Sequence, residues 1–114
     1  MKGRHMNIEF YTPSGQVSES LVAAVRKAIM LQQKLHSKIS KAEISFKQRK
    51  KIVSIEKICE IRFVISGLVN IVTGTADSYD KAVPKAIQKL EEAITLYFKI
   101  HPAFAEPAPA PAEI

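Results

Sequence analysis

Hydrophobic and polar residues alternate along four segments of the chain, and a period of two residues is typical of half-buried β-strands. The four segments are residues 7–12, 41–47, 58–65 and 68–76. The clearest alternation is in the second, where Ala42, Ile44 and Phe46 share one side and polar or charged residues occupy the other. Ser66 and Gly67 separate the last two segments, and such a pair is typical of a tight β-hairpin turn. The sequence therefore predicts four strands, the last two of them joined as a hairpin.

The apolar residues of the segment 18–38 follow the 3.6-residue period of an amphipathic helix. Ser18 is a suitable N-cap, and Glu19 suits the positive N-terminal end of a helix. We expect this helix to end near Ser37 or Lys38. Its predicted buried stripe consists of Leu21, Val25, Ala28, Ile29 and Leu35.

A second amphipathic helix is predicted to start at Asp77 or Ser78 and to run to about Phe98. Its predicted inner stripe consists of Ala82, Val83, Ala86, Ile87, Leu90, Ala93, Ile94 and Tyr97. Pro84 lies inside this pattern and would clash with the carbonyl of Asp80 in a regular helix, at a cost of roughly 3 kcal/mol. We therefore expect a one-residue bulge or a kink just before Pro84.

The predicted elements follow the order strand, helix, three strands, helix. Short connections make the last three strands antiparallel to one another. The first strand reaches the second through a helix, so it can pair with it in parallel by a right-handed crossover. Because each helix has a single apolar stripe, both should lie on one face of the sheet. The sequence thus predicts an α+β fold, a two-layer β-α-β-β-β-α sandwich with a four-stranded sheet whose other face is exposed to water.

We expect residues 6–101 to form a single domain. Residues 1–5 look like a remnant of cloning that precedes a natural start at Met6. Residues 102–114 are rich in alanine and proline and cannot build a core, so they are predicted to form a disordered tail. The single cysteine and the lack of a secretory leader favour a reducing, cytoplasmic location. No apolar run approaches the ~20 residues that a membrane span requires.

Positive charge is concentrated in one part of the sequence. The net charge is +6, and residues 34–57 carry eight lysines or arginines against two glutamates, which equals the whole excess. Such clustering suits a polyanion, either RNA or an anionic membrane surface. A solvated, lysine-rich loop explains the same composition equally well.

Two rows of basic residues on the predicted helices extend this charged region. The row on the last helix repeats every four residues, although like charges at that spacing repel slightly. If the helices pack side by side, this row converges with one on the first helix into a positive groove that grips phosphates. The candidate RNA-binding residues are therefore Arg26, Lys27, Lys34, Lys47, Arg49, Lys50, Lys51, Lys81, Lys85 and Lys89. Solvated helix faces are the alternative explanation of both rows.

The sequence does not indicate catalytic or metal-binding chemistry. The three histidines are scattered, and no cysteines or histidines have the spacing of metal ligands. Cys59 falls on the apolar side of a predicted strand, so we expect a buried, unreactive thiol. We therefore expect no enzymatic activity, no cofactor and no metal site.

Several short motifs, taken in order, resemble the ribosome hibernation promoting factors, a family that includes ribosome-associated inhibitor A and was formerly labelled sigma-54 modulation proteins. The similar stretches are "VSESL" at residues 17–21, "ISKAEISF" at 39–46, the Ser66-Gly67 hairpin and "GTADSYDKAV" at 74–83. Each motif is short, and it is their order and spacing that resemble the family. The similarity covers about residues 6–99.

The resemblance implies a fold like that of double-stranded RNA-binding domains. It also implies a stress or hibernation factor that binds 16S rRNA in the decoding channel of the small ribosomal subunit and inhibits translation in the cytoplasm. The lysine typical of the family's last helix corresponds to Lys89, with Lys81, Lys85 and Arg26 in comparable places. No counterpart of the long-form dimerisation domain is seen, so the chain resembles a short form.

The end of the last helix departs from the family pattern, because a largely apolar stretch follows Glu92 where basic residues are expected. Leu96, Tyr97 and Phe98 are therefore predicted to offer a surface for self-association, with Phe104 nearby in the sequence. Two other functions stay open from the sequence. One is a protein–protein interaction domain that uses this apolar surface, and the other is a double-stranded RNA-binding module that acts away from the ribosome.

Overall fold

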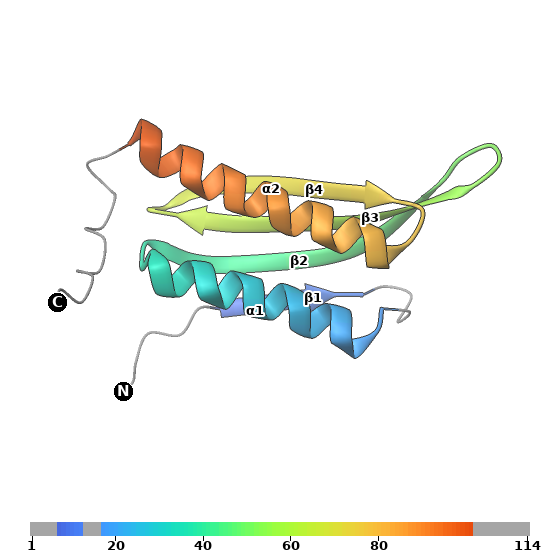
Figure 1. Cartoon of the computed structure of the whole chain (residues 1–114), viewed down its shortest axis with the longest axis horizontal. Helices are drawn as coiled ribbons and strands as arrows, with labels where there is room; N and C mark the ends of the chain where they lie inside the picture. Colours follow the sequence, from blue (N-terminus) through green and yellow to red (C-terminus); the bar gives the residue numbers. More distant parts are fainter. Residues whose placement is uncertain (1–6, 13–16, 102–114) are drawn as a thin grey trace, which may run out of the picture.

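The computed structural model describes residues 7–12 and 17–101, and its elements follow the predicted order (Figure 1). The strands are β1 (Asn7–Tyr11), β2 (Ile39–Lys50), β3 (Ile55–Ile65) and β4 (Leu68–Ala76), and the helices are α1 (Glu19–Leu35) and α2 (Tyr79–Ile100). The strands form one sheet in the order β1-β2-β3-β4, and both helices cover the same face of it. The predicted α+β sandwich is confirmed. The expected cloning remnant at residues 1–5 and the expected tail at residues 102–114 lie outside the described residues.

The alternating pattern places one side of every strand against the helices. β1 pairs with β2 in parallel, and the other neighbouring strands are antiparallel, as expected. Ser18 caps α1 and Ser78 caps α2, each with its side-chain oxygen accepting a bond from a backbone N–H of the first turn. The buried core consists of Val25, Ile29, Ile39, Ala42, Ile44, Phe46, Cys59, Ile61, Phe63, Ile65, Tyr79, Ala82, Val83, Ala86, Leu90, Ile94, Tyr97 and Phe98.

Two predicted boundaries are wrong, the end of α1 and the end of β2. α1 ends at Leu35 rather than near Ser37, because His36 turns to an extended conformation and its ring stacks on Phe98 of α2, with ring centroids 4.4 Å apart. Leu35, expected in the buried stripe, is helical but 46% exposed, because it lies about 120° around the helix from Ile29. The strand predicted over residues 41–47 continues through Lys50, because its pairing with β3 extends to Lys50 opposite Ile55.

α2 is an uninterrupted α-helix from Tyr79 to Ile100, so the prediction of a one-residue bulge before Pro84 is wrong. Pro84 removes one backbone donor in the second turn, and the carbonyl that loses its partner belongs to Asp80. Both residues are exposed, so water can satisfy that carbonyl without any extra residue in the helix.

The predicted self-association surface at the end of α2 is also corrected by the structure. Leu96 is 55% exposed, but Tyr97 and Phe98 are only 8% exposed and belong to the core. Their rings pack edge to face at 5.2 Å, and Phe98 also stacks on His36, the C-cap residue of α1. Tyr97 and Phe98 therefore contribute to the core, and of the three predicted residues only Leu96 lies on the surface.

Close packing of α2 on β4 depends on Gly74. A Cβ atom at this position would lie 2.3 Å from the carbonyl oxygen of Ala82 and 2.4 Å from the backbone nitrogen of Ala86. Both are backbone atoms of α2, which cannot move aside as a flexible side chain can. The glycine therefore sets the distance between helix and sheet where the stretch of α2 around Ala82 and Ala86 packs on β4.

Candidate nucleic-acid interface

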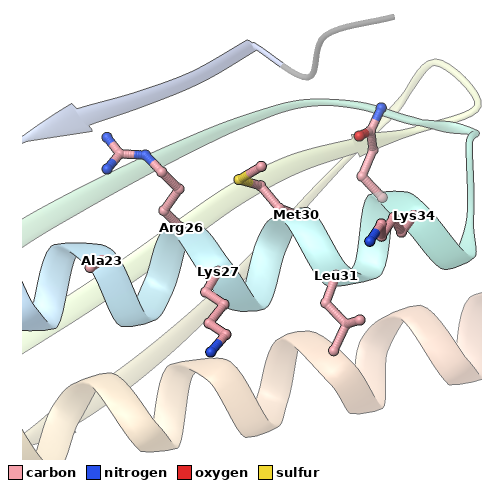
Figure 2. Close-up of a pocket in the computed structure, with 7 residues that line it drawn as sticks. Ala23, Arg26, Lys27, Met30, Leu31 and Lys34 are labelled. Atoms are coloured by element: carbon pink, nitrogen blue, oxygen red, sulfur yellow. The ribbon is translucent and has the colours of Figure 1, made fainter.

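The outer side of α1 carries a shallow hollow that combines basic and apolar side chains. Val25 and Ile29 face the sheet, which leaves the opposite side of the helix in solvent. Within this surface Met30 is 52% and Leu31 is 51% exposed. The residues that line the hollow are Ala23, Arg26, Lys27, Met30, Leu31, Gln33 and Lys34 (Figure 2). Three of the predicted RNA-binding residues are thus brought together on one helix.

The three basic residues of α1 point in different directions around this hollow. Arg26 points towards β1 (Figure 2), and its guanidinium carbon lies 4.9 Å from the centroid of the Phe10 ring. That contact is a cation–π interaction, and it holds the guanidinium in place beside the hollow. Lys27 and Leu31 point to the side on which α2 lies (Figure 2). The hollow is therefore open outward, with positive charge on both of its long sides.

The lysines of α2 lie on the flank next to β4. Lys85 donates from Nζ to the carbonyl oxygen of Thr75 in β4, at 3.1 Å. Lys81 forms an exposed ion pair with Asp77, with Nζ and the carboxylate oxygen 3.5 Å apart. Lys89 is exposed on the same side of the helix, since residues four apart lie almost above one another.

This arrangement contradicts the expected groove between the two helices. The flank of α2 that faces α1 is marked by Phe98, which stacks on His36, and Lys85 lies roughly on the opposite flank. Arg26 points to the β1 side of α1, away from α2. Arg26 and the lysines of α2 therefore diverge towards opposite edges of the helical layer, whereas Lys27 points to the α2 side of α1.

The long β2–β3 ribbon carries the third group of candidates and extends beyond the rest of the sheet (Figure 1). Residues 47–57 contain five lysines or arginines against the single Glu56. Glu56 lies between Arg49 and Lys51, with nitrogen–oxygen distances of 3.4 and 3.5 Å. Lys50 is exposed at the end of β2. The end of this ribbon remains strongly positive after those two pairs are counted.

The open face of the sheet carries mixed charges instead of a positive surface. Lys47 pairs with Glu60, and Lys41 pairs with Glu43 at 3.1 Å. Arg62 lies next to Glu43 on the neighbouring strand. Because carboxylates are interspersed with the cations, a polyanion would meet both signs of charge on this face. Lys47 and Arg49, two of the predicted RNA-binding residues, therefore lie away from the helices and next to glutamates.

Sequence reasoning missed the apolar part of the hollow and the role of Lys57. Met30 and Leu31 follow Lys27 and precede Lys34 at spacings of three and four residues, so the spacing alone could have indicated a shared helix face. Lys57 donates to Gln48 at 2.6 Å, and its Nζ lies 5.4 Å from the centroid of the Tyr79 ring. Tyr79 in turn donates its hydroxyl to the carbonyl of Lys47 at 2.7 Å, which ties the start of α2 to β2.

Cys59 is buried, and burial raises the pKa of its thiol from 9.0 to about 12. We expect Ellman's reagent to modify this thiol at pH 8 only as fast as the protein unfolds. Because the thiol pKa is lower in the unfolded chain, the unfolded chain loses the thiol proton first as the pH rises. The stability that the folded state gains from keeping the thiol protonated is therefore complete below pH 9 and is lost towards pH 12. Rapid labelling of the folded protein at pH 8 would show that the thiol is accessible.

Among residues 7–12 and 17–101, no three His, Cys, Asp or Glu side chains lie close enough together to hold a metal ion. Neither α1 nor α2 combines the length and the apolar character needed to cross a membrane.

Known proteins resemble this chain in structure rather than in sequence. No protein-family model matches the sequence, and no curated protein is similar to it by sequence. A ribosomal subunit interface protein from Coxiella burnetii superposes with a TM-score of 0.66 at 21% identity, over 82% of this chain and 99% of that one. The chain has the fold of a ribosomal subunit interface protein. The N-terminal domain of protein Y from Thermus thermophilus also matches, with a TM-score of 0.63 at 17% identity over 81% of this chain and 99% of that one.

These two structures agree with the fold that the resemblance to hibernation factors implies. Both are covered over 99% of their length, so the whole sandwich is shared rather than a common sub-motif. At such identities the agreement concerns the path of the backbone, and the side chains of the interface must be judged on this chain's own residues.

Proposed function

We propose that this protein is a cytoplasmic stress or hibernation factor that binds 16S rRNA in the decoding channel of the small ribosomal subunit and inhibits translation. The observation that carries the proposal is the shared fold with a ribosomal subunit interface protein over 99% of that protein's length. The basic surface on the outer side of the helical layer supports it, because an rRNA site demands positive charge on one face.

The proposed main contact is the hollow on α1. Arg26, Lys27 and Lys34 would meet phosphates of the rRNA, and Met30 and Leu31 would cover sugars or base edges between them. Phosphate contacts of this kind release counterions, so they give strong binding that weakens steeply with salt. No stacking platform is needed, which fits recognition of a folded RNA by its shape and backbone.

The lysines of α2 and the end of the β2–β3 ribbon are proposed as secondary contacts. Lys89 has no ion pair among the described residues, whereas Lys81 and Lys85 already bind Asp77 and the Thr75 carbonyl. Lys50 and Lys51 extend the positive surface beyond the sheet. We propose that these groups meet more distant phosphates, and that Lys47 and Arg49 do not take part because they lie away from the helices with glutamates beside them.

The proposed action is occupancy of a site rather than a chemical reaction. A domain that fills the channel used by tRNA and mRNA needs affinity and shape but no reactive group. The most nucleophilic side chain of the described residues, Cys59, is buried and protonated, which agrees with this mode of action.

Chemical protection of 16S rRNA in purified small subunits tests the proposed site. We expect the protein to protect nucleotides of the decoding channel and to inhibit a cell-free translation reaction at the same concentrations. Protection confined to other regions of the subunit, or protection without inhibition, would contradict the proposal.

A further inference from the structure

β4 is an edge strand whose outer side is left open in the described structure. It pairs with β3 on one side only, and the sheet ends there (Figure 1). Natural edge strands are usually protected by a charged residue, a proline or a bulge within the strand. β4 reads "LVNIVTGTA" and contains neither a charged residue nor a proline, and its pairing with β3 has no register shift. The chain therefore keeps an edge that is able to pair.

The hairpin geometry determines which backbone groups point outward from this edge. Ser66 and Gly67 have φ angles of 50° and 82°, which matches a two-residue type I′ turn closed by Ile65 and Leu68. In an antiparallel ladder, hydrogen-bonded pairs alternate with non-bonded pairs. The backbone groups of the even-numbered residues of β4 therefore point to β3, and those of Val69, Ile71, Thr73 and Thr75 point outward.

One contact supports this assignment and limits the open stretch. Lys85 donates from Nζ to the carbonyl oxygen of Thr75, which is one of the groups expected to point outward. That lysine covers the edge at the end nearest the start of α2. The backbone groups of Val69, Ile71 and Thr73 are left facing solvent among the described residues.

Apolar side chains flank the open stretch on both faces of the sheet. Val69 and Ile71 are 59% and 50% exposed on the open face. On the helix side, Leu96 is 55% exposed and lies eleven residues after Lys85, about three helical turns along the same flank. An edge with unpaired backbone groups between two apolar margins has the character of a docking site for a strand.

We propose that β4 pairs in antiparallel fashion with β4 of a second copy of this chain, about a two-fold axis at Ile71. In this register the Ile71 residues of the two copies lie opposite each other, and Val69 lies opposite Thr73 of the other copy. All three residues belong to the outward-pointing set, so each opposed pair can exchange two backbone hydrogen bonds. The two sheets would then form one continuous eight-stranded sheet.

A second copy fits this edge better than an unrelated charged segment does. The strand has no charge of its own, so two copies meet without like-charge repulsion, and antiparallel pairing is self-complementary under a two-fold axis. Only one short strand from each copy takes part, so the contact is small and the dimer should be weak and dependent on concentration. The α1 hollow is on the other side of the helical layer, and the inference does not depend on RNA binding.

Sedimentation equilibrium with charge-swapped variants tests the proposed register. We expect the unaltered chain to pass from monomer to dimer between low-micromolar and submillimolar concentrations. Ile71→Lys alone and Ile71→Glu alone should each raise the dissociation constant by about tenfold or more, because like charges would then oppose each other at the axis. An equimolar mixture of the two variants should form dimers again at low salt, because Lys and Glu would face each other.

Leu96→Ser serves as the matched control, since it reduces the apolar margin on the helix side but leaves every residue and backbone hydrogen bond of the proposed strand pair unchanged. This variant should dimerise nearly as well as the unaltered chain. The proposal is overturned if the unaltered chain stays monomeric at every concentration, even if it captures extended peptides of other proteins. It is also overturned if Leu96→Ser abolishes the dimer while Ile71→Lys does not, or if the mixed variants stay monomeric.

Discussion

Replacing Arg26, Lys27 and Lys34 together with glutamine is expected to weaken binding to the small ribosomal subunit by about tenfold or more at physiological salt. These three residues line the hollow on α1, and none of them belongs to the buried core. The slope of log affinity against log salt concentration should become shallower by about two, since each lost phosphate contact removes roughly 0.7–0.9 from it. Binding of the variant and the parent is measured by filter retention of labelled subunits across a salt series.

A control with the same change in charge distinguishes position from net charge. Replacing Lys41, Lys47 and Arg62 with glutamine also removes three positive charges, but from the open face of the sheet where carboxylates lie beside them. This variant should bind nearly as the parent does. Replacing Lys81, Lys85 and Lys89 should have an intermediate effect, because two of these lysines have partners within the protein. Equal losses in all three variants would mean that only the overall charge matters.

Gly74→Ala is expected to give the largest loss of stability of any single methyl addition considered in this fold. The new Cβ would meet two backbone atoms of α2 at 2.3 and 2.4 Å, so the helix has to move away from β4. Overpacking of this kind typically costs about 1–3 kcal/mol, and contacts with backbone atoms place Gly74 at the upper end of that range. For a domain of this size the melting temperature should fall by roughly 10 °C or more, as measured by circular dichroism.

Gly67→Ala provides the comparison for this prediction. Gly67 has a positive φ of 82°, but a Cβ there would have no atom within 4 Å. Its cost should come from backbone conformation alone, at about 1 kcal/mol. If Gly74→Ala melts at or above the temperature of Gly67→Ala, α2 does not pack on β4 as closely as described.

The elements of the fold could be predicted from the sequence because each one is specified locally. The alternating residues lie within the strands that they predict, and Ser18 and Ser78 directly precede the helices that they cap. The predicted ends of elements were wrong where contacts between residues far apart in the sequence determine the boundary. α1 stops at Leu35 because His36 meets Phe98, and β2 continues through Lys50 because β3 pairs with it.

The candidate interface was predictable in its residue types but not in its layout. The period of a helix shows which stripe is buried, but it does not show which flank faces the neighbouring helix. That flank is set by how far α2 rolls on the sheet, and Gly74 allows the close approach that brings Lys85 to the Thr75 carbonyl. The predicted convergence of Arg26 with Lys85 therefore failed, whereas the grouping of Arg26, Lys27 and Lys34 on α1 was correctly expected.

Pro84 shows a different limit of sequence reasoning. The local rule gives the cost of a proline in the middle of a helix, but that cost depends on whether water can reach the carbonyl left without a donor. Asp80 and Pro84 both lie on the exposed side of α2, so the helix stays continuous. A proline on the buried stripe, at the position of Leu90 for example, would leave the carbonyl of Ala86 without its donor inside the core, where water cannot replace it.

Co-sedimentation of the protein with separated small and large ribosomal subunits, at low and high salt, measures the proposed ribosome binding. We expect the protein to pellet with the small subunit at low salt and its binding to fall steeply as salt increases, because phosphate contacts supply most of the affinity. Binding to neither subunit, or binding that does not change with salt, would contradict the proposal.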